Sequence, residues 1–178
     1  MSPLLQRAAR SLIIVLTFYY LLLAVLSAIG VRVNTTKSIP VGLYWKSHHP
    51  IEKGAYVEYC PPQVDVFVEA KKRGYLGSGI CAGDYSFLMK RIAAVSSDRV
   101  SITADGVTVN DHLLPYSVPL VSDKDGQLMP RPQSDHFILG NSEVLLMSDV
   151  SRTSFDGRYF GAVNRAQIMT VIVPVFTW

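Results

Sequence analysis

Ser38 is the first residue whose surroundings suit peptide-bond chemistry, in the stretch Ser38-Ile39-Pro40. Proline fixes its own φ and pushes the preceding residue toward an extended conformation, so this serine lies on a constrained loop. A serine hydroxyl attacks a carbonyl carbon only when a base takes its proton. The alternative interpretation is an ordinary polar loop, because threonine, lysine, serine, proline and glycine are common loop residues.

Lys90 is the candidate base. It lies in the run Tyr85–Val95, which is otherwise apolar except for Ser86 and Arg91 and which predicts a buried strand. A period of two places Lys90 on one face with Leu88, Ile92 and Ala94. Burial disfavours the ammonium form and lowers the pKa of lysine from about 10.4, which lets the amine accept a proton. The alternative is a lysine at a strand end whose amine reaches solvent.

The elements that position these residues begin with an N-terminal apolar segment. Arg7 and Arg10 precede residues 11–31, which carry no charge. As a helix rising about 1.5 Å per residue, this segment spans roughly the 30 Å hydrocarbon core of a bilayer. We therefore predict a cytoplasmic N-terminus at 1–10, a transmembrane anchor at 11–31 and a periplasmic domain at 32–178. A cleavable signal peptide is the alternative, with Ala28-Ile29-Gly30 as its small-x-small site.

The rest of the chain predicts a mainly β protein. A coiled antiparallel sheet or partly open barrel is expected, with a hairpin around Asp105-Gly106 and a small helical insertion that begins at Pro61-Pro62 and ends near Tyr75. Asp111–His136, rich in proline, is expected to be a long excursion or ribbon. Further strands are expected at Leu43–Trp45, Ala55–Tyr59, Val100–Thr103, Val107–Asn110, Phe137–Leu139, Val144–Met147 and Met169–Phe176.

Charge and cysteine content limit the classes of function. The 178 residues carry a net charge of +3, which is small and scattered and argues against nucleic-acid binding. No phosphate-binding glycine loop with its lysine is present. Cys60 and Cys81 in an exported domain predict a disulfide, which would stabilise the fold by about 3 kcal/mol in the chain-entropy model. Two free buried thiols are the alternative.

Several ordered motifs resemble those of bacterial signal peptidase I, a family of Ser/Lys proteases with a membrane anchor and a β-rich catalytic domain. They cover nearly the whole chain and are Ser38-Ile39-Pro40, Lys90–Val100, the Asp105–Asn110 hairpin, Gly140-Asn141 and Ser154–Gly161. The resemblance implies that Ser38 is the nucleophile and Lys90 the general base. It implies that Thr36 binds the oxyanion beside the N–H of Ser38, and that Asp156 and Arg158 lie next to the lysine. It implies no metal and no organic cofactor.

Within that family, the short domain, the Ser-x-Pro-x-Gly-Leu-Tyr motif and the segment between Cys60 and Cys81 resemble the TraF-type peptidases of conjugative plasmids, including broad-host-range plasmids. That resemblance implies an inner-membrane enzyme with a periplasmic catalytic domain that processes, and cyclises, a propilin. The bilayer and other mating-pair-formation proteins are its implied partners. The alternatives are a general leader peptidase and a non-catalytic, anchored assembly factor.

Overall fold

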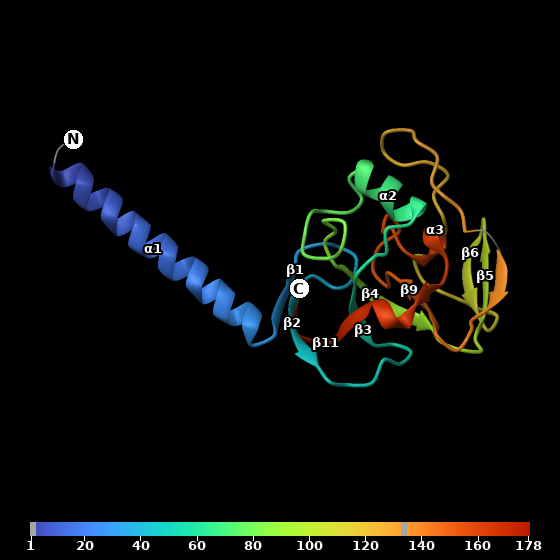
Figure 1. The fold of residues 1–178 in the computed structure, drawn as a ribbon. Coiled ribbons are helices and arrows are strands. Elements are labelled where there is room, and N and C mark those ends of the chain that lie inside the picture. The colour runs from blue at the N-terminus through green and yellow to red at the C-terminus, as the bar shows by residue number, and fades with distance from the viewer. Residues whose placement is uncertain (1–2, 133–134) are drawn as a thin grey trace. The chain divides into compact units, whose positions relative to one another are not determined.

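The computed structural model describes residues 3–132 and 135–178, and the chain divides into two compact units, Met1–Arg32 and Val33–Trp178. The first unit holds helix α1 (Pro3–Ala28), which has no buried residue among those described (Figure 1). By length and composition, α1 is apolar enough to cross a membrane, a test that a signal sequence would also pass. The assignment of 11–31 to an anchor therefore stays a prediction.

Two antiparallel sheets follow α1. The four-stranded sheet lies at the opposite end of the second unit from strand β2 (Figure 1). The seven-stranded sheet has the order β1 (Val31–Asn34), β2 (Gly42–Ser47), β11 (Ile168–Thr177), β3 (Tyr56–Tyr59), β4 (Leu88–Ala94), β9 (Glu143–Met147) and β10 (Val163–Asn164). The four-stranded sheet has the order β7 (His112–Leu113), β6 (Gly106–Val109), β5 (Arg99–Thr103) and β8 (His136–Ile138).

Strand β4 lies between β3 and β9 and carries the residue of greatest interest. Lys90 is opposite Val57 of β3, and Ile92 is opposite Leu146 of β9. These neighbours belong to one hydrophobic core, together with Leu88. A register shift follows Ile92. Ala94, beyond it, packs with Leu145 and Met147 on the other face of β9 and with residues of β5 and β6 in a second core. The side chain of Lys90 therefore shares a sheet face with the main core.

Three short helices cover this framework: α2 (Asp65–Lys72), α3 (Gly157–Phe160) and a 3-10 turn at Arg165–Gln167. The start of α2 predicted at Pro61-Pro62 is wrong, whereas the helix ends at Lys72, a few residues before Tyr75, with Lys71 and Lys72 in its last turn. Val64 is still extended, and Gly74 at φ 74° follows the last turn. A disulfide joins Cys60 to Cys81, with Cα atoms 5.5 Å apart, and links the approach to α2 with the loop beyond it.

The predicted fold class, a mainly β protein with a coiled antiparallel sheet and few helices, is confirmed. The Asp105-Gly106 hairpin joins β5 to β6 as expected. The strand predicted at Tyr85–Val95 is shorter, at Leu88–Ala94. The stretch Asp111–His136 is largely irregular in its described part, with the short β7, the first residue of β8 and a bridge between Ser122 and Leu128; residues 133 and 134 lie outside the described residues.

Candidate active site

Lys90 is buried, with 1% of its surface exposed, on the face of β4 that the sequence predicted. Burial lowers the pKa of its amine from 10.5 to about 8; the negative charge of Asp156 opposes this change and the positive charge of Arg158 adds to it. Nζ donates a hydrogen bond to Ser154 Oγ over 2.7 Å. In its neutral form, the amine keeps a lone pair that can accept a proton.

Asp156 and Arg158 form a buried ion pair. Arg158 Nε donates to Asp156 Oδ1 over 2.7 Å and Nη2 donates to Oδ2 over 2.8 Å, with 0% of either side chain exposed. Asp156 also accepts from the backbone N–H of Arg158, as the N-cap of α3, and from the N–H of Ser148 over 3.0 Å. The carboxylate is thus committed to Arg158 and the backbone, and it acts on Lys90 through its charge.

The remaining donors of Arg158 hold the surrounding loops. Nη1 donates to the carbonyl oxygen of Tyr116 over 2.6 Å and to that of Arg152 over 3.1 Å. A buried guanidinium is tolerated only when its charge and donors are matched in this way. Arg158 therefore fixes the turn that carries Ser154 and Asp156.

Ser154 is a site residue that reasoning from residue types missed. It is 7% exposed and takes the hydrogen bond of Lys90. Its signal in the sequence was its place in the same Ser-x-Asp motif as Asp156. The next position of that motif is Gly157, where a Cβ atom would lie 2.6 Å from Leu145 Cδ1 and 2.9 Å from the Leu146 carbonyl oxygen. Only glycine lets the motif pack this closely against β9.

Ser38 lies half-buried on the loop between β1 and β2. The next residue, Ile39, is fully buried in a small core with Tyr44 and Ile172, and Met89 packs against that core. Met89 precedes Lys90, so the chain neighbours of the candidate nucleophile and of the candidate base belong to one apolar cluster. Within the described residues no hydrogen bond joins Ser38 to Lys90. Lys90 Nζ donates to Ser154 Oγ instead.

Thr36 is exposed, two residues before Ser38, but its hydroxyl is engaged. Thr36 Oγ1 donates to Asn34 Oδ1 over 3.0 Å, and the N–H of Thr36 donates to the same oxygen over 3.1 Å. Before it can donate to an oxyanion, the hydroxyl proton has to turn away from Asn34.

The end of the β1–β2 loop that leads into β2 is held by the sheet. Tyr44 Oη donates to the carbonyl oxygen of Pro40 over 2.6 Å, and the N–H of Trp178 donates to that of Val41 over 3.0 Å. At Gly42 a Cβ atom would lie 2.1 Å from the carbonyl oxygen of Phe176, so only glycine allows β2 and β11 to approach here.

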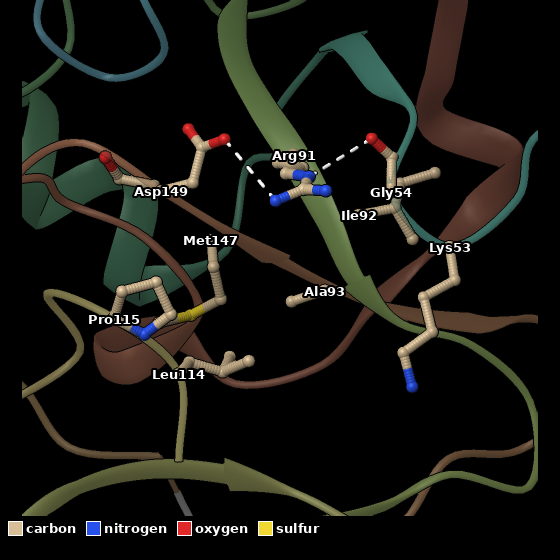
Figure 2. Close-up of a pocket in the computed structure, with 10 residues that line it drawn as sticks. Lys53, Gly54, Arg91, Ile92, Ala93, Leu114, Pro115, Met147 and Asp149 are labelled. Carbon is tan, nitrogen blue, oxygen red and sulfur yellow. Dashed lines mark hydrogen bonds and ion pairs between the residues drawn. The ribbon is translucent and has the colours of Figure 1, made fainter. Parts of the chain in front are cut away.

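A cavity of about 190 Å³ lies beside this region without containing the candidate dyad. Its lining includes Arg91, the residue after Lys90, and Asp149, the residue after Ser148. In Figure 2 the guanidinium of Arg91 lies between Asp149 and the backbone carbonyl of Gly54. Tyr56 also donates to Asp149 Oδ2, over 2.6 Å; burial and this bond raise the pKa of Tyr56. These ionic groups join β3, β4 and the segment that follows β9.

Metal ligands are not gathered in this region. In the part of the chain that the structure describes, no three histidine, cysteine, aspartate or glutamate side chains lie close enough together to hold a metal ion.

Three comparisons relate this chain to known proteins. The family model for signal peptidase, peptidase S26, matches residues 5–178. A plasmid transfer protein TraF of Escherichia coli is 59% identical over 178 residues, covering 100% of both chains. A second Escherichia coli protein of that name is 64% identical over 149 residues, 84% of each chain. A crystal structure of a signal peptidase I from Enterococcus faecalis V583 has a TM-score of 0.42 and 13% identity, covering 71% of this chain and 100% of that one.

Proposed function

This chain belongs to the S26 family of signal peptidases, and from that premise we propose that it is a membrane-anchored serine endopeptidase with a Ser38/Lys90 dyad. The observation that carries the proposal is Lys90, a buried amine whose pKa is lowered to about 8. An ordinary lysine is protonated at neutral pH and cannot serve as a base. A lysine with this pKa is partly neutral in the physiological range and can activate a serine.

In the first half of the reaction, Ser38 Oγ attacks the carbonyl carbon of the scissile peptide bond, and Lys90 Nζ takes the hydroxyl proton. The negative charge that develops on the carbonyl oxygen is stabilised by the N–H of Ser38 and by the hydroxyl of Thr36 after it turns from Asn34. The C–N bond then breaks, and Lys90 returns the proton to the leaving amine. The product is an ester between Ser38 and the new carboxyl end of the substrate.

Positioning residues support this step. Ser154 accepts one N–H of Lys90, which orients the lone pair of the neutral amine. Asp156 and Arg158 hold the turn that carries Ser154, and their opposite charges balance around Lys90. The ion pair therefore sets the position and the charge state of the base without taking its proton.

In the second half, either water or an amine attacks the ester, and Lys90 again moves the proton. Water gives a linear product. The α-amine of the same substrate chain gives a head-to-tail ring, with a new peptide bond formed as the ester bond to Ser38 breaks. The substrate that we propose is the propilin of a conjugative plasmid transfer system, because the relatives are named as plasmid transfer proteins.

The experiment is co-expression of the full chain with the propilin of its own transfer system, followed by intact-mass measurement. Processing that depends on Ser38 and gives a product one water lighter than the linear chain supports a cyclising peptidase. Processing without loss of that water limits the function to hydrolysis. Cleavage of many exported precursors indicates a general leader peptidase. Pilus assembly that is unchanged in Ser38→Ala indicates a non-catalytic assembly factor.

A further inference from the structure

Asn34, the last residue of β1, lies at the centre of the nucleophile loop, which we define as residues 35–41. Its side chain is 2% exposed. Nδ2 donates to three backbone carbonyl oxygens of the loop, those of Thr36 at 2.8 Å, Ile39 at 2.9 Å and Pro40 at 3.0 Å. Oδ1 accepts from the N–H and the hydroxyl of Thr36. One side chain therefore bonds to the loop on both sides of Ser38.

These partners fix which way the amide points. A backbone carbonyl only accepts and a backbone N–H only donates, so exchange of Nδ2 and Oδ1 would set oxygen against three oxygens and NH₂ against an N–H. The amide in its present orientation is fully used, because both lone pairs of Oδ1 and both hydrogens of Nδ2 have partners. Such a satisfied buried group is rigid, whereas a half-satisfied one is costly.

The consequence for Ser38 is geometric. The carbonyl groups of Thr36 and Ile39 flank the dipeptide Lys37-Ser38, and both are tied to the same buried nitrogen. Because both carbonyl groups bind Asn34 Nδ2, the backbone between them has little freedom. The N–H and the Cβ of Ser38 therefore take fixed directions. Catalytic geometry is sensitive to this, since a misplacement of about 1 Å lowers a rate by about 100-fold.

The consequence for Thr36 is different. Its N–H stays on Asn34 Oδ1 when its hydroxyl proton turns to an oxyanion, so the residue keeps its place during the turn. Asn34 thereby holds the hydroxyl within the loop and still leaves its proton free to move.

We propose that Asn34 is a positioning residue that presets the direction of Ser38 and of the Thr36 hydroxyl for acylation. The inference rests on the proposed function, since it assigns a role within the Ser38/Lys90 reaction. In this role Asn34 contacts neither the substrate nor Lys90, and it acts through the backbone of the nucleophile loop. A residue of this role changes the rate of acylation and leaves both the affinity for the acyl donor and the pKa of the base unchanged.

The test uses the full chain in detergent with p-nitrophenyl acetate as the acylating probe. Acetylation of Ser38 is followed by intact mass and peptide mapping, and Ser38→Ala is the blank. In Asn34→Ala and in the equal-sized Asn34→Asp, which loses the donors but keeps the acceptors, the saturating rate of acetylation is expected to fall by about 100-fold. The probe concentration that gives half the saturating rate is expected to stay as in the unchanged protein. The pH at which the rate falls to half as Lys90 takes up a proton is also expected to stay the same.

Ser117→Ala is the matched control. Ser117 is 1% exposed, accepts from the N–H of Val107 over 3.0 Å and donates to the Leu114 carbonyl oxygen over 2.7 Å. Ser117→Ala removes a buried hydrogen bond between a side chain and the backbone beside β6, and the bonds of Ser117 go to Val107 and Leu114 rather than to Ser38, Lys90 or Asp156. Full acetylation is expected in this variant, even though the loss of its buried hydrogen bonds lowers thermal stability.

The outcomes separate the two proposals. If the unchanged protein is not acetylated on Ser38, the proposed peptidase function fails, and the role of Asn34 fails with it. If the unchanged protein reacts and both Asn34 variants react equally fast, only the role of Asn34 is overturned. If both variants are unfolded by circular dichroism while Ser117→Ala is folded, Asn34 is a determinant of the fold, and its positioning role is likewise overturned.

Discussion

The surroundings of Lys90 destabilise the charged form of its amine. Its side chain lies on the core face of β4, and the carboxylate that attracts its ammonium form, Asp156, is already paired with Arg158. Desolvation therefore outweighs attraction, and the pKa of Lys90 falls from 10.5 to about 8. A lysine near solvent, with the same neighbours, would keep its proton.

The first prediction is the pH dependence of processing. Because the folded pKa of Lys90 is depressed, the amine is neutral above about pH 8 and takes up a proton as the pH falls through that value. The rate is therefore expected to rise with pH to a plateau and to fall on acidification, with a midpoint near 8. Initial rates of Ser38 acylation between pH 6 and 10 measure this limb. A midpoint near the ordinary pKa of histidine, about 6.5, would contradict it.

The second prediction is that Lys90→Arg is inactive although it keeps the positive charge. A guanidinium does not give up its proton at these pH values, so it cannot accept one from Ser38. Loss of a general base lowers a rate by about 100- to 10,000-fold. Lys90→Ala and Ser38→Ala are expected to lose as much, and the double variant to lose no more, because the two residues act as one unit. Processing by Lys90→Arg above a tenth of the normal rate would exclude Lys90 as the base.

The third prediction concerns Asp156→Asn, which is expected to lower the free energy of unfolding as well as the activity, because Asp156 belongs to a buried ion pair. The change leaves the guanidinium of Arg158 buried without its carboxylate, and breaking a buried pair from one side costs about 3–5 kcal/mol. Urea unfolding of the full chain in detergent measures this loss. Glu69→Gln is the control, because it removes a surface pair with Arg73 at 2.8 Å, which solvent screens and which adds little to stability. Equal unfolding free energies for the two variants would argue against this account.

At the scale of elements, the alternation of apolar residues predicted which strand face is buried better than turn residues predicted where helices begin and end. Leu88, Lys90 and Ile92 recur every second residue, and this pattern predicted the face of β4 that carries the lysine, while an amine that reaches solvent was the alternative. The start of α2 was missed because proline is compatible with a first turn but does not require one, and Val64 is still extended. Periodicity reports which face is buried, and it reports ends poorly.

The candidate site was only partly predictable for the same reason. Ser154 and Asn34 are ordinary residue types in the sequence, and their roles come from contacts across 64 positions in one case and from the path of a loop in the other. Nothing in the spacing of Asn34, Ser38 and Pro40 indicates that the loop folds back onto the asparagine side chain. Such contacts depend on the backbone angles of the whole loop.

The fourth prediction belongs to the elements that the disulfide joins. Cys60 and Cys81 are 21 positions apart in the sequence and enclose α2, and neither carries a group that the proposed reaction uses. Cys60→Ser with Cys81→Ser is expected to lower the unfolding free energy by about 3 kcal/mol in the chain-entropy model. Acylation of Ser38 by the folded fraction is expected to be normal at low temperature. Thermal unfolding with and without reductant checks the first part, and an acylation defect in fully folded protein would contradict the second.

At the scale of the whole molecule, one apolar patch of the second unit is left uncovered. Leu43 and Trp45 alternate with the buried Tyr44 on β2, and Phe176 of β11 is opposite Leu43. The ring of Trp178 lies 5.7 Å from that of Phe176. These side chains are between 37% and 69% exposed. An exposed patch of this kind marks a contact with a protein or a membrane, and tryptophan favours the water–lipid boundary.

The last prediction is that this patch contacts the surface of a lipid bilayer. The chain contains only two tryptophans, Trp45 and Trp178, and both belong to the patch, so tryptophan fluorescence reports on it alone. In the full chain reconstituted into vesicles, lipids brominated near the headgroup should quench this emission, and unbrominated lipids of the same composition should not. Trp45→Phe and Trp178→Phe, measured singly, assign the quenching to each residue. Emission that is equal in the two kinds of vesicle and fully quenched by acrylamide from the water phase would show that the patch faces solvent, where a protein partner rather than lipid would have to cover it.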